Sequence, residues 1–117
     1  MSIVIVVLSI LLAALLGYTG AMKVMHTTTA AGNAAHLGIG TRQSQLIGAA
    51  ELAAVAGLLI GLAVRPLLVI TTAAVIALMV GAVAYHLRAK DPLTAALPAA
   101  VTAAAAAATL ALDIALS

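Results

Sequence analysis

Long apolar stretches alternate with short polar connections along the chain, and four of these stretches are long enough to cross a bilayer. A spanning helix needs about 20 mostly apolar residues, because the hydrocarbon core is about 30 Å thick. The pattern therefore predicts an all-α integral membrane four-helix bundle, with the whole chain forming a single four-span transmembrane domain. The predicted spans are residues 3–24, 45–64, 66–87 and 93–116.

The polar connections predict how these spans are arranged. The connections after spans two and three are only a few residues long, so the spans that they join are expected to be antiparallel neighbours. Pro66 suits the first turn of the third span. Asp91 is expected to cap the fourth span, with Pro92 in its first turn. Residues 27–44 form the one longer connection, which is expected to lie at the membrane interface.

The composition supports a membrane protein and excludes several other classes. Apolar residues make up 66% of the 117 residues and charged residues only 7%, whereas a soluble domain carries about 25% charge. The chain therefore has too few polar side chains to cover a water-facing surface. A net charge of +2 is too small for a nucleic-acid surface, so no nucleic-acid partner is expected. Without cysteine the chain has no thiol chemistry of its own.

The basic residues are distributed unevenly between the two sides of the predicted bundle. Arg65 is the basic side chain expected on one side, here called the Arg65 side, together with both termini. The opposite side, here called the Lys23 side, receives Lys23, Arg42, Arg88 and Lys90. Cytoplasmic loops carry an excess of lysine and arginine. The loops after spans one and three are therefore predicted to be cytoplasmic, in a bacterial inner (plasma) membrane.

Each predicted span has one face of small or polar residues, and these faces are expected to form the bundle interior. Lipid provides no hydrophobic drive for helix association, so small residues that permit close approach matter most. Gly57 and Gly61 form a GxxxG pair on such a face of the second span. These residues are interpreted as packing positions.

Glu51 is a carboxyl group set inside the second span, roughly 9 Å along the helix axis from Gln45. A carboxylate facing lipid would be unfavourable, so Glu51 is expected to face protein or a wet cavity. Lys23 and His86 end the first and third spans at a similar depth and are its expected partners. The sequence leaves open whether Glu51 is an ion-paired carboxylate or a protonated acid in a dry pocket. It also leaves open whether the pair is structural or part of a site.

Three sequence motifs resemble the DoxX-like family of small four-helix integral membrane proteins. They are GAMKVM (20–25), GAAELAAVAGLLIGL (48–62) and MVGAVAYHLRAKDP (79–92). On this resemblance Lys23, Glu51 and His86 take the family's polar positions. The family is functionally mixed, with members tied to thiosulfate:quinone oxidation, oxidative-stress complexes, quinone handling or receptor assembly. The resemblance therefore implies the architecture more than the reaction.

Three functional hypotheses follow, and one of them, a transporter or channel, is disfavoured because four helices enclose little pore. In the first, a lipophilic small molecule (quinone-, terpenoid-, sterol- or polyketide-like) is bound, or transformed by acid/base chemistry, in an intramembrane pocket near the Lys23 side. An isomerase or an epoxide-opening enzyme would use such chemistry, and a quinone-linked oxidoreductase subunit is the alternative kind of enzyme. The candidate catalytic residues are Glu51, His86 and Lys23, and the candidate substrate-binding residues are Tyr18, Gly20, Met79 and Tyr85. In the second, the chain is a noncatalytic subunit that anchors or assembles a larger membrane (redox) complex.

The remaining polar residues suggest no further chemistry. A metal site needs about four convergent ligands, and the spacing of the histidines and acids does not indicate one, so neither a metal nor a cofactor is predicted. Asp113 is interpreted as a solvated helix-end residue, and His26 and His36 as interfacial residues. The expected partners are the lipid bilayer, a lipophilic small molecule, and either a second copy of the chain in a homodimer or another membrane protein.

Overall fold

The computed structural model describes residues 2–116, and within that range it is helical, without β-strands. Its five helices are α1 (Ile3–Val24), α2 (Thr28–Leu37), α3 (Thr41–Gly61), α4 (Arg65–Arg88) and α5 (Leu93–Ala115). All except α2 are long and apolar enough to cross a membrane. The predicted all-α membrane architecture with four spanning helices is therefore confirmed.

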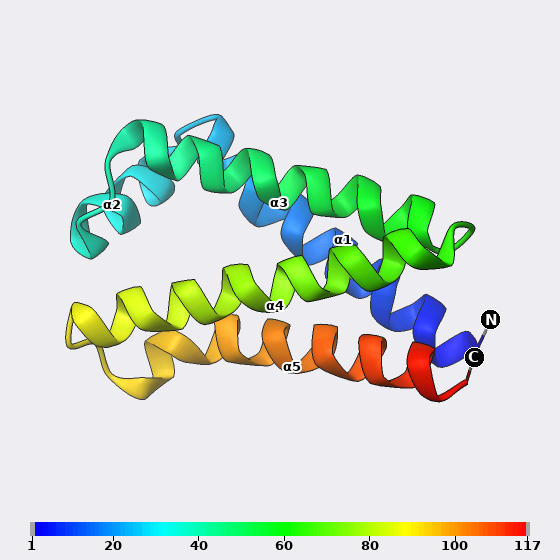
Figure 1. Cartoon of the computed structure of the whole chain (residues 1–117). Helices are drawn as coiled ribbons and strands as arrows, with labels where there is room; N and C mark the ends of the chain where they lie inside the picture. Colours follow the sequence, from blue (N-terminus) through cyan, green and yellow to red (C-terminus); the bar gives the residue numbers. More distant parts are fainter. Residues whose placement is uncertain (1, 117) are drawn as a thin grey trace.

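The four long helices form a ring of two antiparallel pairs (Figure 1). Helix α1 packs chiefly against α3, and α4 packs chiefly against α5. Contacts of α3 with α4 and of α1 with α5 join the two pairs. The pairs lie close together near the two chain ends and diverge toward the end that carries α2 (Figure 1). The interior is therefore wider on the Lys23 side than on the Arg65 side.

The long connection between the first two spans contains a helix, which the sequence analysis did not predict. Thr27 caps α2 by accepting a hydrogen bond from the Ala30 N–H at 3.2 Å. Gly38 ends the helix in the left-handed conformation, with φ of 72°, which glycine adopts at low cost. The next helix starts at Thr41, four residues earlier than predicted. Hydropathy missed α2 because its composition is too polar and too rich in small residues to resemble a span.

The start of α5 differs from the prediction. Pro92 is the N-cap residue, and no side chain caps the helix. Asp91 was expected to provide the cap, but its carboxylate bonds to two histidine rings instead. Pro66 does lie in the first turn of α4, where its missing N–H costs no helical hydrogen bond.

Glycines set the closest helix contacts. A Cβ atom on Gly61 would lie 2.8 Å from the Leu68 backbone, and one on Gly57 would collide with Thr71. The GxxxG pair on α3 therefore packs against α4. On the same helix, a Cβ on Gly48 would lie 2.7 Å from the carbonyl oxygen of Gly20 on α1. Such approaches are the usual use of small residues in membrane helix packing.

Asp113 is buried and paired, so its interpretation as a solvated residue was wrong. Its side chain is only 5% exposed. Arg65 Nε donates a hydrogen bond to Asp113 Oδ2 at 3.0 Å, and Nη2 of the same guanidinium donates to the Asp113 carbonyl at 2.7 Å. This two-point contact joins the start of α4 to the end of α5. No sequence pattern indicates this contact, because the partners are 48 residues apart along the chain.

Candidate functional site: a cavity between the helix pairs

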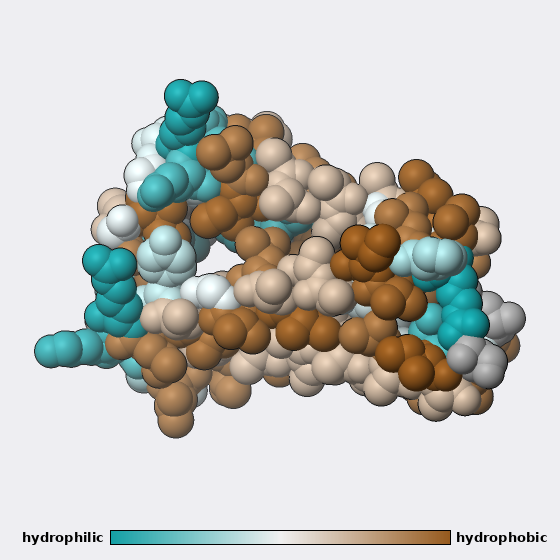
Figure 2. Space-filling model, viewed as in Figure 1, coloured by the Kyte–Doolittle hydropathy of each residue, from teal (hydrophilic) through white to brown (hydrophobic). Residues whose placement is uncertain are grey.

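A cavity of about 720 Å³ lies between the diverging helix pairs. The space-filling view shows a hollow between the two arms of the molecule, toward the left end of the view, which is one of the two ends where hydrophilic residues gather (Figure 2). All five helices contribute to the lining, which consists mainly of aliphatic side chains and alanines. The polar lining residues include Thr19, Lys23 and Glu51 on one wall and Tyr85 and His86 on another. An apolar lining with a few polar groups is typical of a small-molecule site.

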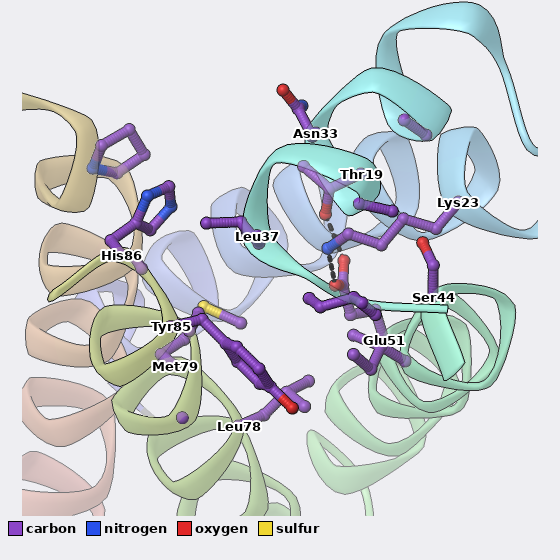
Figure 3. Close-up of a pocket in the computed structure, with 18 of the residues that line it drawn as sticks. Thr19, Lys23, Asn33, Leu37, Ser44, Glu51, Leu78, Met79, Tyr85 and His86 are labelled. Atoms are coloured by element: carbon purple, nitrogen blue, oxygen red, sulfur yellow. Dashed lines mark hydrogen bonds and ion pairs between the residues drawn. The ribbon is translucent and has the colours of Figure 1, made fainter. Parts of the chain in front are cut away.

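Glu51 is the most deeply buried polar group on the cavity wall, with 1% of its side chain exposed. The Lys23 ammonium donates a hydrogen bond to Oε1, and the Thr19 hydroxyl donates one to Oε2 (Figure 3). Both carboxyl oxygens of Glu51 therefore have a hydrogen-bond donor. The side chain of Lys23 is 33% exposed, so its ammonium borders both the carboxylate and the open space.

Helix spacing and close packing explain why these three groups meet. Thr19 and Lys23 are four residues apart on α1, so they share a face of that helix. Gly20 lies between them and packs against Gly48 of α3. Glu51 follows Gly48 by three residues and therefore points from the same face of α3. The glycine contact brings the two backbones close enough for the ion pair to form across them.

The opposite wall is formed by α4, with Leu78, Met79, Tyr85 and His86 (Figure 3). His86 Nδ1 lies 2.8 Å from Asp91 Oδ2. Its ring thus lies between the cavity and the connection from α4 to α5. Glu51 and His86 have separate partners, and within residues 2–116 no hydrogen bond joins them.

Asp91 also binds a second histidine. His36 Nε2, from α2, lies 2.6 Å from Asp91 Oδ1. The hydrogen bond from His86, and next the one from His36, hold the pKa of Asp91 below its ordinary value. The carboxylate therefore links α2 to the α4–α5 connection at the rim of the cavity.

The structure brings most of the sequence-predicted residues to one cavity. Lys23, Glu51, Met79, Tyr85 and His86 all line it. The other two candidates, Tyr18 and Gly20, lie outside the lining. Tyr18 is 68% exposed on the outer side of α1, and Gly20 is covered by the packing of α1 against α3.

Three contributors were missed from the sequence. Thr19 was not singled out, although its position four residues before Lys23 placed both on one face. Asp91 resembled a helix cap, and His36 depends on the unpredicted α2. Within the described residues, no group of histidines and acids is arranged to hold a metal ion.

The cavity residues lie within the part of the chain that matches the model of a known protein family. The model of the DoxX-like family matches residues 7–108. This range includes every cavity residue named above, whereas Asp113 lies beyond it. Searches of curated proteins and of solved structures gave no match.

Proposed function

The chain belongs to the DoxX-like family, and from this membership and the chemistry of its cavity we propose that it binds a lipophilic small molecule within the membrane. Four apolar helices able to cross a bilayer make it an integral membrane protein. Molecules dissolved in the hydrocarbon region are therefore its natural ligands. The proposed ligand is quinone-, terpenoid-, sterol- or polyketide-like, with a hydrocarbon body and at least one oxygen.

The observation that carries the proposal is the position of the Glu51–Lys23 ion pair on the wall of an apolar cavity. The Arg65–Asp113 pair at the other end of the bundle joins two helices without lining the cavity. Glu51 and Lys23 instead border about 720 Å³ of space. Ionisable groups inside a membrane protein commonly mark a ligand or proton pathway.

The proposed chemistry is acid/base. Lys23 and Thr19 donate to Glu51 and would orient its carboxylate as a base toward a C–H or O–H bond of the ligand. Lys23 would stabilise an oxygen that becomes negative. His86, on the α4 wall, would take up or release the other proton that such a reaction moves. Isomerisation or epoxide opening needs this combination and no electron transfer.

Glu51→Gln tests the proposal, with Asp113→Asn as the matched control. Each variant replaces a buried, ion-paired carboxylate by an amide, but only Glu51 lines the cavity. The purified proteins are compared by native mass spectrometry for copurifying lipophiles and by thermal unfolding in detergent. We expect Glu51→Gln to lose the bound lipophile and Asp113→Asn to keep it. Equal retention by both variants, or absence of any lipophile from the wild type, would contradict ligand binding.

A second candidate function is assembly of a larger membrane complex. The outward side of α5 exposes a face of small residues, Ala100, Ala104, Ala107, Ala108 and Ala111. Small residues at this spacing allow another helix to approach closely. Ala104→Leu with Ala108→Leu would then release a partner chain or a second copy without altering the cavity. Crosslinking in native membranes followed by mass spectrometry of the products measures that release.

A further inference from the structure

His86 lies between the cavity and a carboxylate that does not line it. The histidine is part of the cavity lining, whereas Asp91 is not. Asp91 approaches the ring at Nδ1, with an N–O distance of 2.8 Å. The other ring nitrogen, Nε2, therefore lies on the edge of the imidazole that Asp91 does not occupy, and this edge is available to a molecule in the cavity.

The chemistry of the carboxylate fixes which nitrogen carries the proton. A carboxylate only accepts hydrogen bonds, and a neutral imidazole has a single N–H. A neutral His86 must therefore carry its proton on Nδ1, which leaves Nε2 as an acceptor. His36 contacts the same carboxylate through Nε2 and must carry its proton there. One carboxylate thus imposes opposite tautomers on two histidines, and their hydrogen bonds keep it ionised.

We propose that Asp91 positions His86 so that Nε2 accepts a hydrogen bond from a hydroxyl group on the lipophilic ligand. The inference rests on the proposed function, since it requires the cavity to hold a lipophile. It narrows the ligand class to lipophilic alcohols and phenols. An ether, ester or ketone has only acceptors and gains no bond at a neutral His86.

The apolar wall agrees with this class. Leu78 and Met79 line the same α4 wall about two helical turns from His86, so a hydrocarbon body can pack along this wall while its hydroxyl reaches Nε2. Asp91 touches the ring and not the cavity, which makes it a positioning residue. Its removal would change the orientation and tautomer of His86 without removing any ligand contact.

The first experiment reads the tautomers directly. The chain has three histidines, so selective ¹⁵N labelling gives a simple spectrum, which single substitutions assign. In the whole protein in nanodiscs, at a pH where the histidine rings are neutral, we expect the Nδ1–H tautomer at His86 and the Nε2–H tautomer at His36. Asp91→Ala should abolish the preference at His86, and Arg88→Ala, outside the lining, should preserve it. An Nε2–H tautomer at His86 in the wild type would overturn the proposal.

The second experiment tests the ligand chemistry with a matched pair of probes. 4-Octylphenol and its methyl ether, 4-octylanisole, differ mainly in the O–H donor. We expect the phenol to bind about fivefold more tightly, the effect of about one neutral hydrogen bond. Asp91→Ala should remove this difference, and Arg88→Ala should keep it.

The outcomes separate this inference from the proposed function. If both probes bind equally well to the wild type, the cavity takes lipophiles but the hydroxyl contact is wrong. If neither probe nor any copurified lipophile binds, the proposed function fails, and the ligand part of the inference fails with it. If Asp91→Ala unfolds the protein, Asp91→Asn replaces it, and an unchanged phenol preference with an Nε2–H tautomer at His86 would overturn the proposal.

Discussion

At the residue scale, the two partners of the Glu51–Lys23 pair differ in how well they tolerate loss of the other. Glu51 is 1% exposed and Lys23 is 33% exposed. Lys23→Met would leave a buried carboxylate with Thr19 as its remaining donor, at a cost of about 3–5 kcal/mol. Glu51→Gln keeps an acceptor for Lys23, whose flexible chain can also reach water, so we expect a cost of about 1 kcal/mol. Unfolding in mixed SDS and detergent micelles measures both.

The double variant Lys23→Met with Glu51→Gln is the control for this asymmetry. It removes both charges and leaves no unpaired carboxylate, so we expect it to be more stable than Lys23→Met alone. If Lys23→Met proved as mild as Glu51→Gln, the carboxylate would have to be solvated, and the buried geometry would be wrong.

Asp91 gives the structure a predictable response to acid. Its pKa is lowered in the folded protein by the hydrogen bonds from His86 and His36. A carboxyl group with a lowered folded pKa stabilises the fold above its unfolded pKa of about 4 and loses that contribution as the pH falls through the folded value. The difference in Tm between the wild type and Asp91→Asn should therefore be large above about pH 4 and shrink below it. A constant difference down to the most acidic conditions would contradict the assignment.

Single residues were predictable where one helix face determined their surroundings. Glu51 could be expected to point inward and to meet Lys23, because both follow from depth and from the high cost of a carboxylate in lipid. Asp113 and Asp91 could not be placed in this way. Arg65, the partner of Asp113, and His36, one of the two partners of Asp91, come from segments more than 45 residues away in the sequence. Only the assembled fold brings them together.

At the element scale, the Gly20–Gly48 contact is the condition for the ion pair between α1 and α3. A Cβ on Gly48 would lie 2.6 Å from the Cβ of Lys23, so Gly48→Ala must push the helices apart. We expect a loss of about 1–3 kcal/mol from overpacking. Gly81→Ala on α4 is the control, since a Cβ there meets nothing within 4 Å and alanine favours the helix by up to about 1 kcal/mol. Comparable losses in both variants would rule out close packing as the cause.

The long helices were predictable as elements, whereas α2 was not. Hydropathy identifies segments that lipid would accept, and the four spans satisfy that criterion. Helix α2 has only 10 residues and is held by local caps at Thr27 and Gly38. Those signals were present in the sequence, but alanine, glycine and threonine in an interfacial segment are equally compatible with an irregular loop.

At the scale of the whole molecule, the cavity results from the unequal spacing of the two helix pairs. Gly57 and Gly61 hold α3 close to α4 near the Arg65 side. Toward the Lys23 side the pairs diverge, and α2 lies at that end (Figure 1). The sequence showed which faces are small or polar. It did not show where those faces would separate, because the divergence depends on all the helix contacts at once.

The orientation of the bundle decides which compartment the wider end faces, and the absence of cysteine from the chain makes this testable. Thr41 lies on the Lys23 side and Ala63 on the Arg65 side, and both are exposed and uncharged. Replacing either by cysteine therefore leaves the distribution of positive charge, which sets topology, unchanged. We expect a membrane-impermeant maleimide to label Ala63→Cys in intact spheroplasts and Thr41→Cys only after permeabilisation. The reverse pattern would place Asp91, the two histidines and the mouth of the cavity on the outer face, so that protons exchanged at His86 would come from outside the cell.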